Sequence, residues 1–167
     1  LCHSALASLP HKLPVRGIAW SPDGKLLATC TGHWGTGQQG EVKIWDANSM
    51  KELFKLTGHT SSVTGVAFSP DGSRLASIGM VPDKPEYGGA KIWSVETGDA
   101  VLSIPHGDGL SVAFSPDGRL LALGRRDGHV WLCDALTGDR VHNLSGHSTS
   151  AFGVAFSPDG KTVASCG

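Results

Sequence analysis

Three kinds of residues could carry chemistry on their types alone: a Gly-Lys-Thr string, eight histidines and four cysteines. Gly160-Lys161-Thr162 is similar to the end of a phosphate-binding loop, but the earlier glycine of such a loop would fall at Ala155, and short strands are predicted where a helix is needed. The histidines are scattered and lack the i, i+4 helix spacing of a zinc enzyme. We therefore expect no catalytic residue, no metal and no cofactor.

The cysteines are far apart in the sequence, so none forms the Cys-x-x-Cys pair of a zinc knuckle. Two disulfides are conceivable, but we interpret Cys2, Cys30, Cys133 and Cys166 as reduced, buried, small hydrophobic residues, which favours a cytoplasmic protein. The glycosylation sequon at Asn143-Leu144-Ser145 is interpreted as accidental.

The composition is that of an ordinary globular domain, with 167 residues, 40% hydrophobic and 17% charged residues and a formal net charge of −1. A near-zero net charge argues against a general nucleic-acid binder and against a polybasic membrane patch. No apolar run approaches the roughly 20 residues of a membrane span. The chain starts at Leu1 without a methionine and ends inside a predicted strand, so we expect a piece of a longer protein.

An internal repeat dominates the sequence. Ser-Pro-Asp-Gly occurs four times, from Ser21, Ser69, Ser115 and Ser157, at spacings of 48, 46 and 42 residues. Proline at the second position presets a turn, and glycine supplies the permissive position that follows. Such a period is close to that of a four-stranded propeller blade, about 40–45 residues.

Short apolar runs flank each turn and recur in the same order, which predicts antiparallel strands joined by tight turns. No sustained 3.6-residue apolar period is present, so essentially no helix is expected. The predicted first strands of the units are 15–20, 63–68, 110–114 and 152–156, and the second strands are 26–31, 74–78, 120–124 and 162–166. The predicted third strands are 41–46, 90–94 and 129–134, and the fourth strands are 52–56, 100–104 and 140–144.

These units resemble the WD (Trp-Asp) repeat. Gly58-His59 and Gly146-His147 end two fourth strands, and Trp45-Asp46 is an intact Trp-Asp pair. The resemblance covers nearly the whole chain and implies an all-β propeller whose blades are arranged radially around a channel.

The resemblance divides the chain into three complete blades and parts of two others. Residues 3–11 would be the outer strand of a preceding blade, followed by blade 1 (15–57), blade 2 (63–105), blade 3 (110–145) and the first half of blade 4 (152–167). These make fifteen predicted strands, an arc and not a closed ring. An arc exposes two blade faces that could support self-association. Two chains could also close one ring, but we favour a segment of a larger propeller.

In the WD family a histidine, a hydroxyl residue, a tryptophan and an aspartate often form a hydrogen-bonded network within a blade. Carried over to this sequence, these positions are occupied incompletely in every blade, and we interpret them as structural and not as a catalytic triad. The network positions are His11, Thr29 and Trp45 in blade 1, with Gln39 in place of Asp; His59, Ser77 and Trp93 in blade 2, with Tyr87 in place of Asp; Asp127 in blade 3, with Leu123 and Cys133 in place of the hydroxyl and the tryptophan; and His147 and Ser165 in blade 4.

Binding is expected at the end opposite the Ser-Pro-Asp-Gly turns, where the loops between second and third strands differ in length. These loops carry Trp34, Tyr87, Arg125 and Arg126, residue types enriched in interface hot spots. There are alternative interpretations: Trp34 could fold back on its blade, Tyr87 could cover the network, and the two arginines could be ordinary solvated charges. If these residues form a docking surface, mutating Trp34 and Arg125 together should weaken a partner about tenfold.

The function expected from these features is a scaffold that binds other proteins or peptides, without enzymatic activity. This expectation rests on the resemblance in fold. The alternatives are a regulatory propeller fused to a catalytic domain elsewhere and a propeller hydrolase or lyase. The latter needs acids or bases on the innermost strands, which read Gly-Ile-Ala-Trp, Gly-Val-Ala-Phe and Ser-Val-Ala-Phe.

Overall fold

A computed structural model describes residues 8–33, 38–80, 88–105 and 108–167. Within these ranges the chain forms fourteen β-strands and no helix, which confirms the all-β prediction. None of the described residues forms a helix long and apolar enough to cross a bilayer. The strands are β1 (Val15–Trp20), β2 (Leu26–Thr31), β3 (Val42–Asp46), β4 (Glu52–Leu56), β5 (Val63–Phe68), β6 (Arg74–Gly79), β7 (Gly89–Ser94), β8 (Ala100–Pro105), β9 (Gly109–Phe114), β10 (Leu120–Arg125), β11 (Val130–Asp134), β12 (Arg140–Leu144), β13 (Gly153–Phe156) and β14 (Val163–Cys166).

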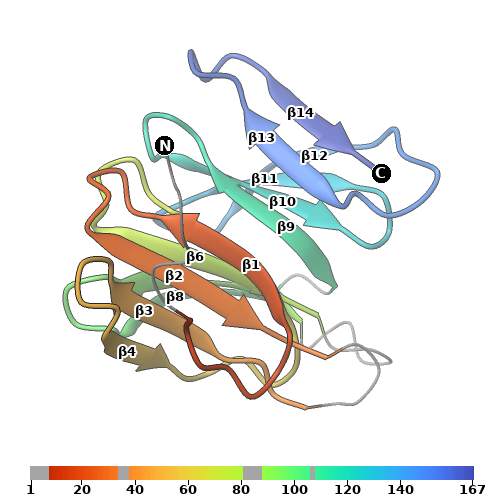
Figure 1. Ribbon diagram of the computed structural model, residues 1–167. Coiled ribbons are helices and arrows are strands. Elements are labelled where there is room, and N and C mark those ends of the chain that lie inside the picture. Colours follow the sequence, from red (N-terminus) through yellow and green to blue (C-terminus); the bar gives the residue numbers. More distant parts are fainter. Residues whose placement is uncertain (1–7, 34–37, 81–87, 106–107) are drawn as a thin grey trace, which may run out of the picture.

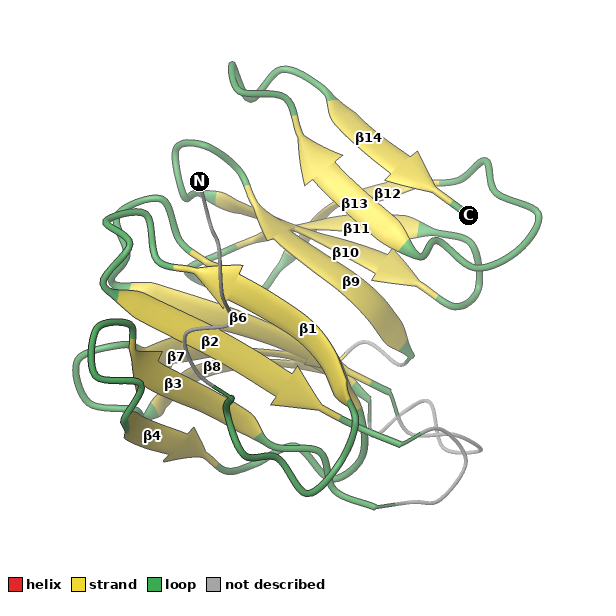
Figure 2. Ribbon diagram, viewed as in Figure 1, coloured by secondary structure: helices red, strands yellow, loops and turns green. Residues whose placement is uncertain are grey.

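The strands form three four-stranded antiparallel sheets and one two-stranded sheet, each a meander in sequence order (Figures 1 and 2). We call these blade 1 (β1–β4), blade 2 (β5–β8), blade 3 (β9–β12) and blade 4 (β13–β14). The first strands of successive blades, β1, β5, β9 and β13, lie next to one another. The leading strand predicted at 3–11 falls partly outside the described residues, and residues 8–11 carry no strand.

All four Ser-Pro-Asp-Gly turns have the same hydrogen bonds. In the first, the Ser21 hydroxyl donates to the Asp23 carboxylate (2.7 Å) and accepts the Leu26 backbone N–H (2.9 Å). Gly24 closes the turn with its N–H on the Ser21 carbonyl and a φ of 70°. Because the hydroxyl stabilises the ionised carboxylate, the pKa of Asp71 in the second turn falls to about 2. The motif is therefore a rigid structural turn.

These turns also contact one another around the arc. A Cβ added to Gly72 would lie 3.6 Å from Pro22 Cδ, and one on Gly118 would lie 3.5 Å from Pro70. Gly24 has no such neighbour. The proline of each turn thus packs against the glycine of the next, and the row is open at Gly24.

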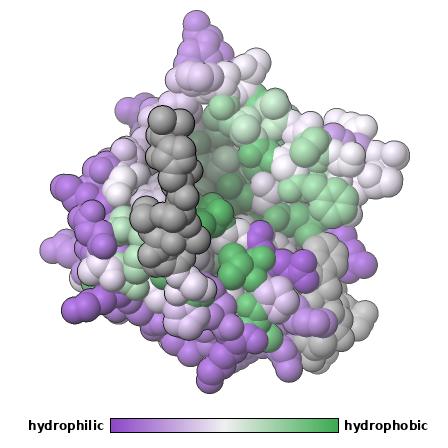
Figure 3. Space-filling view, in the orientation of Figure 1, coloured by the Kyte–Doolittle hydropathy of each residue, from purple (hydrophilic) through white to green (hydrophobic). Residues whose placement is uncertain are grey.

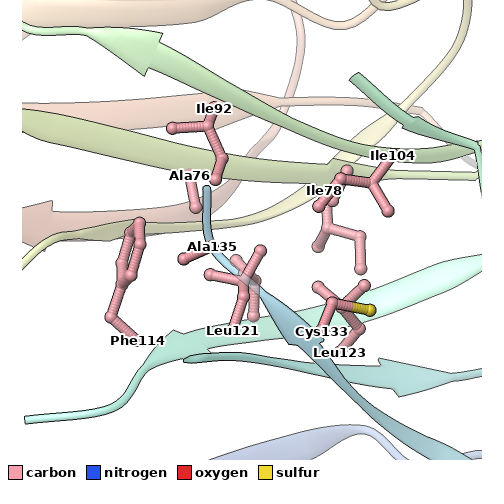
Figure 4. Close-up of a cluster of buried hydrophobic side chains, with 11 residues drawn as sticks. Ala76, Ile78, Ile92, Ile104, Phe114, Leu121, Leu123, Cys133 and Ala135 are labelled. Atoms are coloured by element: carbon pink, nitrogen blue, oxygen red, sulfur yellow. The ribbon is translucent and has the colours of Figure 1, made fainter. Parts of the chain in front are cut away.

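The core lies between the sheets. The cluster between blades 2 and 3 places Ile78 and Ile92 of one sheet opposite Leu121, Leu123 and neighbouring residues of the next (Figure 4). Each such side chain stabilises the fold by about 1.5–3 kcal/mol when fully buried. A second cluster fills the space between blades 1 and 2, and a smaller one lies between blades 3 and 4. Packing between sheets therefore holds the blades together.

Bulges recur at two positions that the alternating pattern does not reveal. On β5 the register with β6 shifts between Val63 and Gly65, which leaves Thr64 as the extra residue, and β1 and β9 shift at the equivalent place. The outer strands β4, β8 and β12 shift near their starts, beside Leu53, Val101 and Val141. These three hydrophobic side chains are 47–56% exposed because the bulge turns them away from the core.

Among the described residues, no sheet packs against the outer face of blade 1. Ile18 and Trp20 on β1 are 62% and 56% exposed, whereas Val66 and Phe114, at the equivalent places in blades 2 and 3, are each 9% exposed. Figure 3 shows hydrophobic surface on this side of the molecule, where β1 lies in front in Figure 1. The arc predicted from the repeat count is thus apolar on a free face.

Candidate functional site

The hydroxyl, histidine and tryptophan of blade 2 meet at one buried point. Trp93 Nε1 donates to Ser77 Oγ (2.8 Å), and His59 Nε2 lies 2.7 Å from the same oxygen. Burial, and then the nearby Lys91, lowers the pKa of His59 to about 4, so the imidazole is neutral at pH 7 and can accept the serine proton. Ser77 is 0% exposed. No substrate can reach this hydroxyl. The three side chains connect β6, β7 and the Gly58-His59 turn through hydrogen bonds.

Blade 1 makes only half of this arrangement. Trp45 Nε1 donates to Thr29 Oγ1 (2.9 Å), as its counterpart does in blade 2. The His11 ring lies edge-on to Trp45 with centroids 5.5 Å apart, and neither of its buried ring nitrogens has a hydrogen-bond partner. Burial is also the main cause that lowers the pKa of His11. His11 therefore packs as a neutral ring beside the pair.

The half blade at the end of the described chain keeps the histidine–serine contact. His147 Nε2 lies 2.8 Å from Ser165 Oγ, at an exposed position. Blades 1, 2 and 4 thus use the same backbone frame to place a hydroxyl, and only blade 2 completes the three-residue contact.

Blade 3 replaces the network with charge. Among the described residues, which leave out His106, Asp127 accepts from Arg125 Nη2 (2.7 Å) and from the His129 backbone N–H. Arg125 in turn stacks over the Trp131 ring at 3.9 Å. The assignment of Asp127 to the network therefore stays a prediction, and the described partners of its carboxylate are Arg125 and the His129 backbone.

The four residues expected to form the docking surface differ in whether the structure describes them and in how exposed they are. Trp34 and Tyr87 lie outside the described residues. The Arg125 side chain is only 14% exposed and engaged within blade 3, whereas that of Arg126 is 55% exposed and 3.5 Å from the Asp108 carboxylate. Of the two arginines, Arg126 is the one available to a partner.

Phe152 joins Arg126 at the same end of the arc and was not anticipated. It is 57% exposed. The preceding residues hold it there, since Ser150 Oγ donates to the Arg126 carbonyl (3.0 Å) and the Ala151 N–H donates to the Arg125 carbonyl (2.8 Å). The available signal was positional, because Phe152 stands five residues before its Ser-Pro-Asp-Gly turn, where blade 2 has the polar Thr64.

Two shallow hollows flank the Gly58-His59 turn at this end. One, beside blade 1, contains Glu41 and Lys55, and the other, beside blade 2, contains Lys91 and Ser103. Within the described ranges, no three His, Cys, Asp or Glu side chains converge as metal ligands would.

The chain is similar to proteins built from WD repeats. Residues 4–46 and 50–80 match the family model described as WD domain, G-beta repeat. Residues 87–159 match the model described as Anaphase-promoting complex subunit 4 WD40 domain. The two matches together span most of the sequence.

Two curated relatives share this likeness. The chain is 32% identical over 160 residues to the meiotic recombination protein rec14 of Schizosaccharomyces pombe, across 95% of this chain and 50% of that protein. It is 46% identical over 54 residues to the WD repeat-containing protein SL1-17 of Schistosoma mansoni, across 32% of this chain and 18% of that protein. The chain thus spans about half the length of the first relative and less of the second.

Proposed function

Because the chain belongs to the WD-repeat family, we propose that it is a non-catalytic scaffold segment that binds a partner protein or peptide through the end of the arc opposite the Ser-Pro-Asp-Gly turns. One observation carries the proposal: the two ends of the blades differ in regularity. The Ser-Pro-Asp-Gly end repeats the same hydrogen-bonded turn four times. The other end varies in every blade and presents Arg126 and Phe152 together.

A rigid frame with variable loops suits recognition. Phe152 offers an exposed apolar ring and Arg126 an exposed guanidinium, a pair typical of the anchors in protein interfaces. The hydroxyl–histidine–tryptophan contact in blade 2 stabilises the frame. Free thiols at Cys30 and Cys133, both buried, support our proposal of a reducing compartment such as the cytoplasm.

The test begins with crosslinking of the protein in its native extract and identification of the captured partner. The affinity of that partner is then measured for the protein and for the double variant Arg126→Ala/Phe152→Ala. We expect a loss of at least about tenfold, equivalent to about 1.4 kcal/mol. The matched control is Leu136→Ala, which removes a leucine that is 82% exposed at the opposite end.

The control decides which end binds. An affinity unchanged by Leu136→Ala and lowered by the double variant supports the proposal. A loss confined to Leu136→Ala would move the docking surface to the Ser-Pro-Asp-Gly end and refute it.

A further inference from the structure

Blade 1 and blade 2 place a lysine at the same position on their third strands, with different surroundings. Lys43 on β3 pairs across the sheet with Lys55, and Lys91 on β7 pairs with Ser103 on β8. Lys43 Nζ lies 2.8 Å from the Glu52 carboxylate and 3.8 Å from that of Glu41. The lysine of blade 1 is therefore neutralised within its own sheet.

Blade 2 has lost both of these carboxylates. In its strand register, the position of Glu41 is taken by Gly89 and that of Glu52 by Ala100. Among the described residues, the Lys91 ammonium contacts Ser103 Oγ, at 2.8 Å. An exposed ammonium whose side-chain partner is a neutral hydroxyl keeps further donors for water or a ligand, and an acceptor that carries charge would satisfy them best.

The space left by the lost side chains is open. A hollow of about 260 Å³ lies over Lys91 and is lined by Gly58, Gly88, Gly89, Ser103 and their neighbours. Gly58 lies beside this hollow, where a Cβ would make ordinary van der Waals contact with Lys91 Cε at 3.5 Å. This volume is below that of a typical small-molecule site, about 300–1,000 Å³, and suits one inserted side chain.

The equivalent hollow of blade 1 shows what fits. There Glu41 occupies the space, and its carboxylate lies 2.7 Å from Lys55 Nζ. The two hollows lie on either side of the Gly58-His59 turn. The chain's own glutamate lines the one beside blade 1, and no carboxylate of the described residues lines the one beside blade 2.

We propose that the Lys91 hollow of blade 2 is a carboxylate-binding subsite that receives an Asp or Glu side chain from an acidic segment of a partner protein. The carboxylate takes the place that Glu41 holds in blade 1 and accepts hydrogen bonds from Lys91 Nζ and Ser103 Oγ. The identity of the ligand as part of a docking partner rests on the proposed scaffold function. The binding chemistry of the hollow does not.

The experiment uses two small probes, N-acetylglutamate α-amide and its neutral counterpart N-acetylglutamine α-amide. Each is titrated into isotope-labelled protein while the NMR signals of the Lys91 side chain and the His59 ring are followed. We expect saturable shifts with the glutamate probe and an affinity up to about fivefold higher than with the glutamine probe, since an exposed ion pair contributes up to about 1 kcal/mol.

Three variants define the site. Lys91→Gln removes the cation and should lower the affinity for the glutamate probe about fivefold. Ala100→Glu restores the carboxylate that blade 1 has at Glu52 and should compete to the same extent; position 89 is unsuitable because the φ of Gly89 is 153°. Glu41→Ala removes the glutamate that lines the blade 1 hollow and should create a second binding site, seen at the Lys55 signals.

Equal binding of the two probes, or an affinity unchanged by both Lys91→Gln and Ala100→Glu while the His59 signals report a folded blade, would overturn the subsite. That result would leave the docking surface at Arg126 and Phe152 intact, because it is tested with a captured partner and separate variants. Failure of the latter test would likewise leave the probe titration interpretable.

Discussion

Ser77 is the residue on which the buried contact in blade 2 depends. Its hydroxyl serves both Trp93 and His59, whereas Thr29 in blade 1 serves Trp45 alone. A hydroxyl side chain at the same repeat position therefore bonds two polar groups in blade 2 and one in blade 1.

Removing the two hydroxyls should reveal this difference. Ser77→Ala leaves an indole N–H and an imidazole nitrogen buried without partners, so we expect a loss of about 2–6 kcal/mol in the free energy of unfolding, at about 1–3 kcal/mol for each unsatisfied group. Thr29→Val removes one partner from one group and should cost about 1–2 kcal/mol. Urea unfolding at pH 7 measures both, and equal losses would contradict the three-residue contact.

His59 should make stability fall in mildly acidic solution. Its pKa in the folded protein is about 4, against 6.5 in an unfolded chain. Below pH 6.5 the unfolded chain binds the proton first, so the contribution of His59 is complete above pH 6.5 and is lost as the pH falls towards 4. The loss is on the order of 3 kcal/mol at about 1.4 kcal/mol for each pH unit.

Unfolding free energies between pH 7 and pH 4 test this expectation. His59→Gln should flatten most of the slope, with a smaller part remaining for His11, whose pKa is also lowered. His142→Gln, on the exposed strand β12, is the control and should leave the slope unchanged. A slope that persists in His59→Gln would show that other groups cause it.

The thiols should differ sharply in reactivity. Burial raises the pKa of Cys30 to about 12 and that of Cys133 to about 11, whereas Cys166 is exposed. The thiolate is the reactive form. In the Cys2→Ser variant, we therefore expect one thiol per chain to react rapidly in a thiol-labelling assay at pH 8. Fast labelling at Cys30 or Cys133, located by peptide mapping, would mean that the blades open readily.

At the scale of the strands, Arg74 on β6 fastens blade 2 to blade 3. Its Nη1 donates to the Ala135 carbonyl and its Nη2 to the Gly118 carbonyl, each at 2.9 Å, and its guanidinium lies 5.5 Å from the Phe114 ring centroid. The equivalent positions in the other blades are Leu26, Leu120 and Thr162, which cannot form these bonds. This junction is therefore unlike the others.

Arg74→Met should weaken that junction. We expect a loss of about 2–3 kcal/mol, because two carbonyls lose a charged donor worth about 1.5 kcal/mol or more. Arg119→Met, which removes an exposed arginine beside the same turn, should change the free energy of unfolding by less than about 0.5 kcal/mol. Thermal and urea unfolding of both variants decide the point, and comparable effects would argue against the clamp.

At the scale of the whole molecule, we expect the free face of blade 1 to govern association. Ile18 and Trp20 expose an apolar surface whose equivalents are buried between the other blades. In those junctions, small residues of one blade, such as Ala28 and Cys30, meet large ones of the next, such as Phe68. The free face is thus shaped to receive a surface of small residues.

Charge on this face should suppress association of the 167-residue chain. Size exclusion with light scattering should show a mass that rises with concentration for the natural sequence and a monomer for Ile18→Glu/Trp20→Glu. Leu136→Glu introduces one of these charges in the turn after β11 of blade 3, at a leucine that is 82% exposed, and should leave the mass unchanged. A monomer at all concentrations without any substitution would contradict this expectation.

The sequence by itself determined the repeating frame. The spacing of Ser-Pro-Asp-Gly and the short apolar runs predict sheets of four antiparallel strands, and the structure confirms them. Local chemistry is sufficient there, because the hydroxyl, the carboxylate and the glycine of each turn bond within six residues of one another. Strand alternation then decides which side chains face the neighbouring sheet.

Tertiary structure decided the site. Sequence spacing brought out Arg125 and Arg126 equally, but only folding shows that Asp127 and Trp131 occupy the first and leave the second exposed. Bulges, which shift register without a clear sequence signal, set the exposure of Leu53 and its equivalents. The hollow beside Lys91 lacks two carboxylates that stand at the equivalent positions of blade 1. The sequence alone does not reveal this, because only the strand register shows where those groups lie in the neighbouring blade.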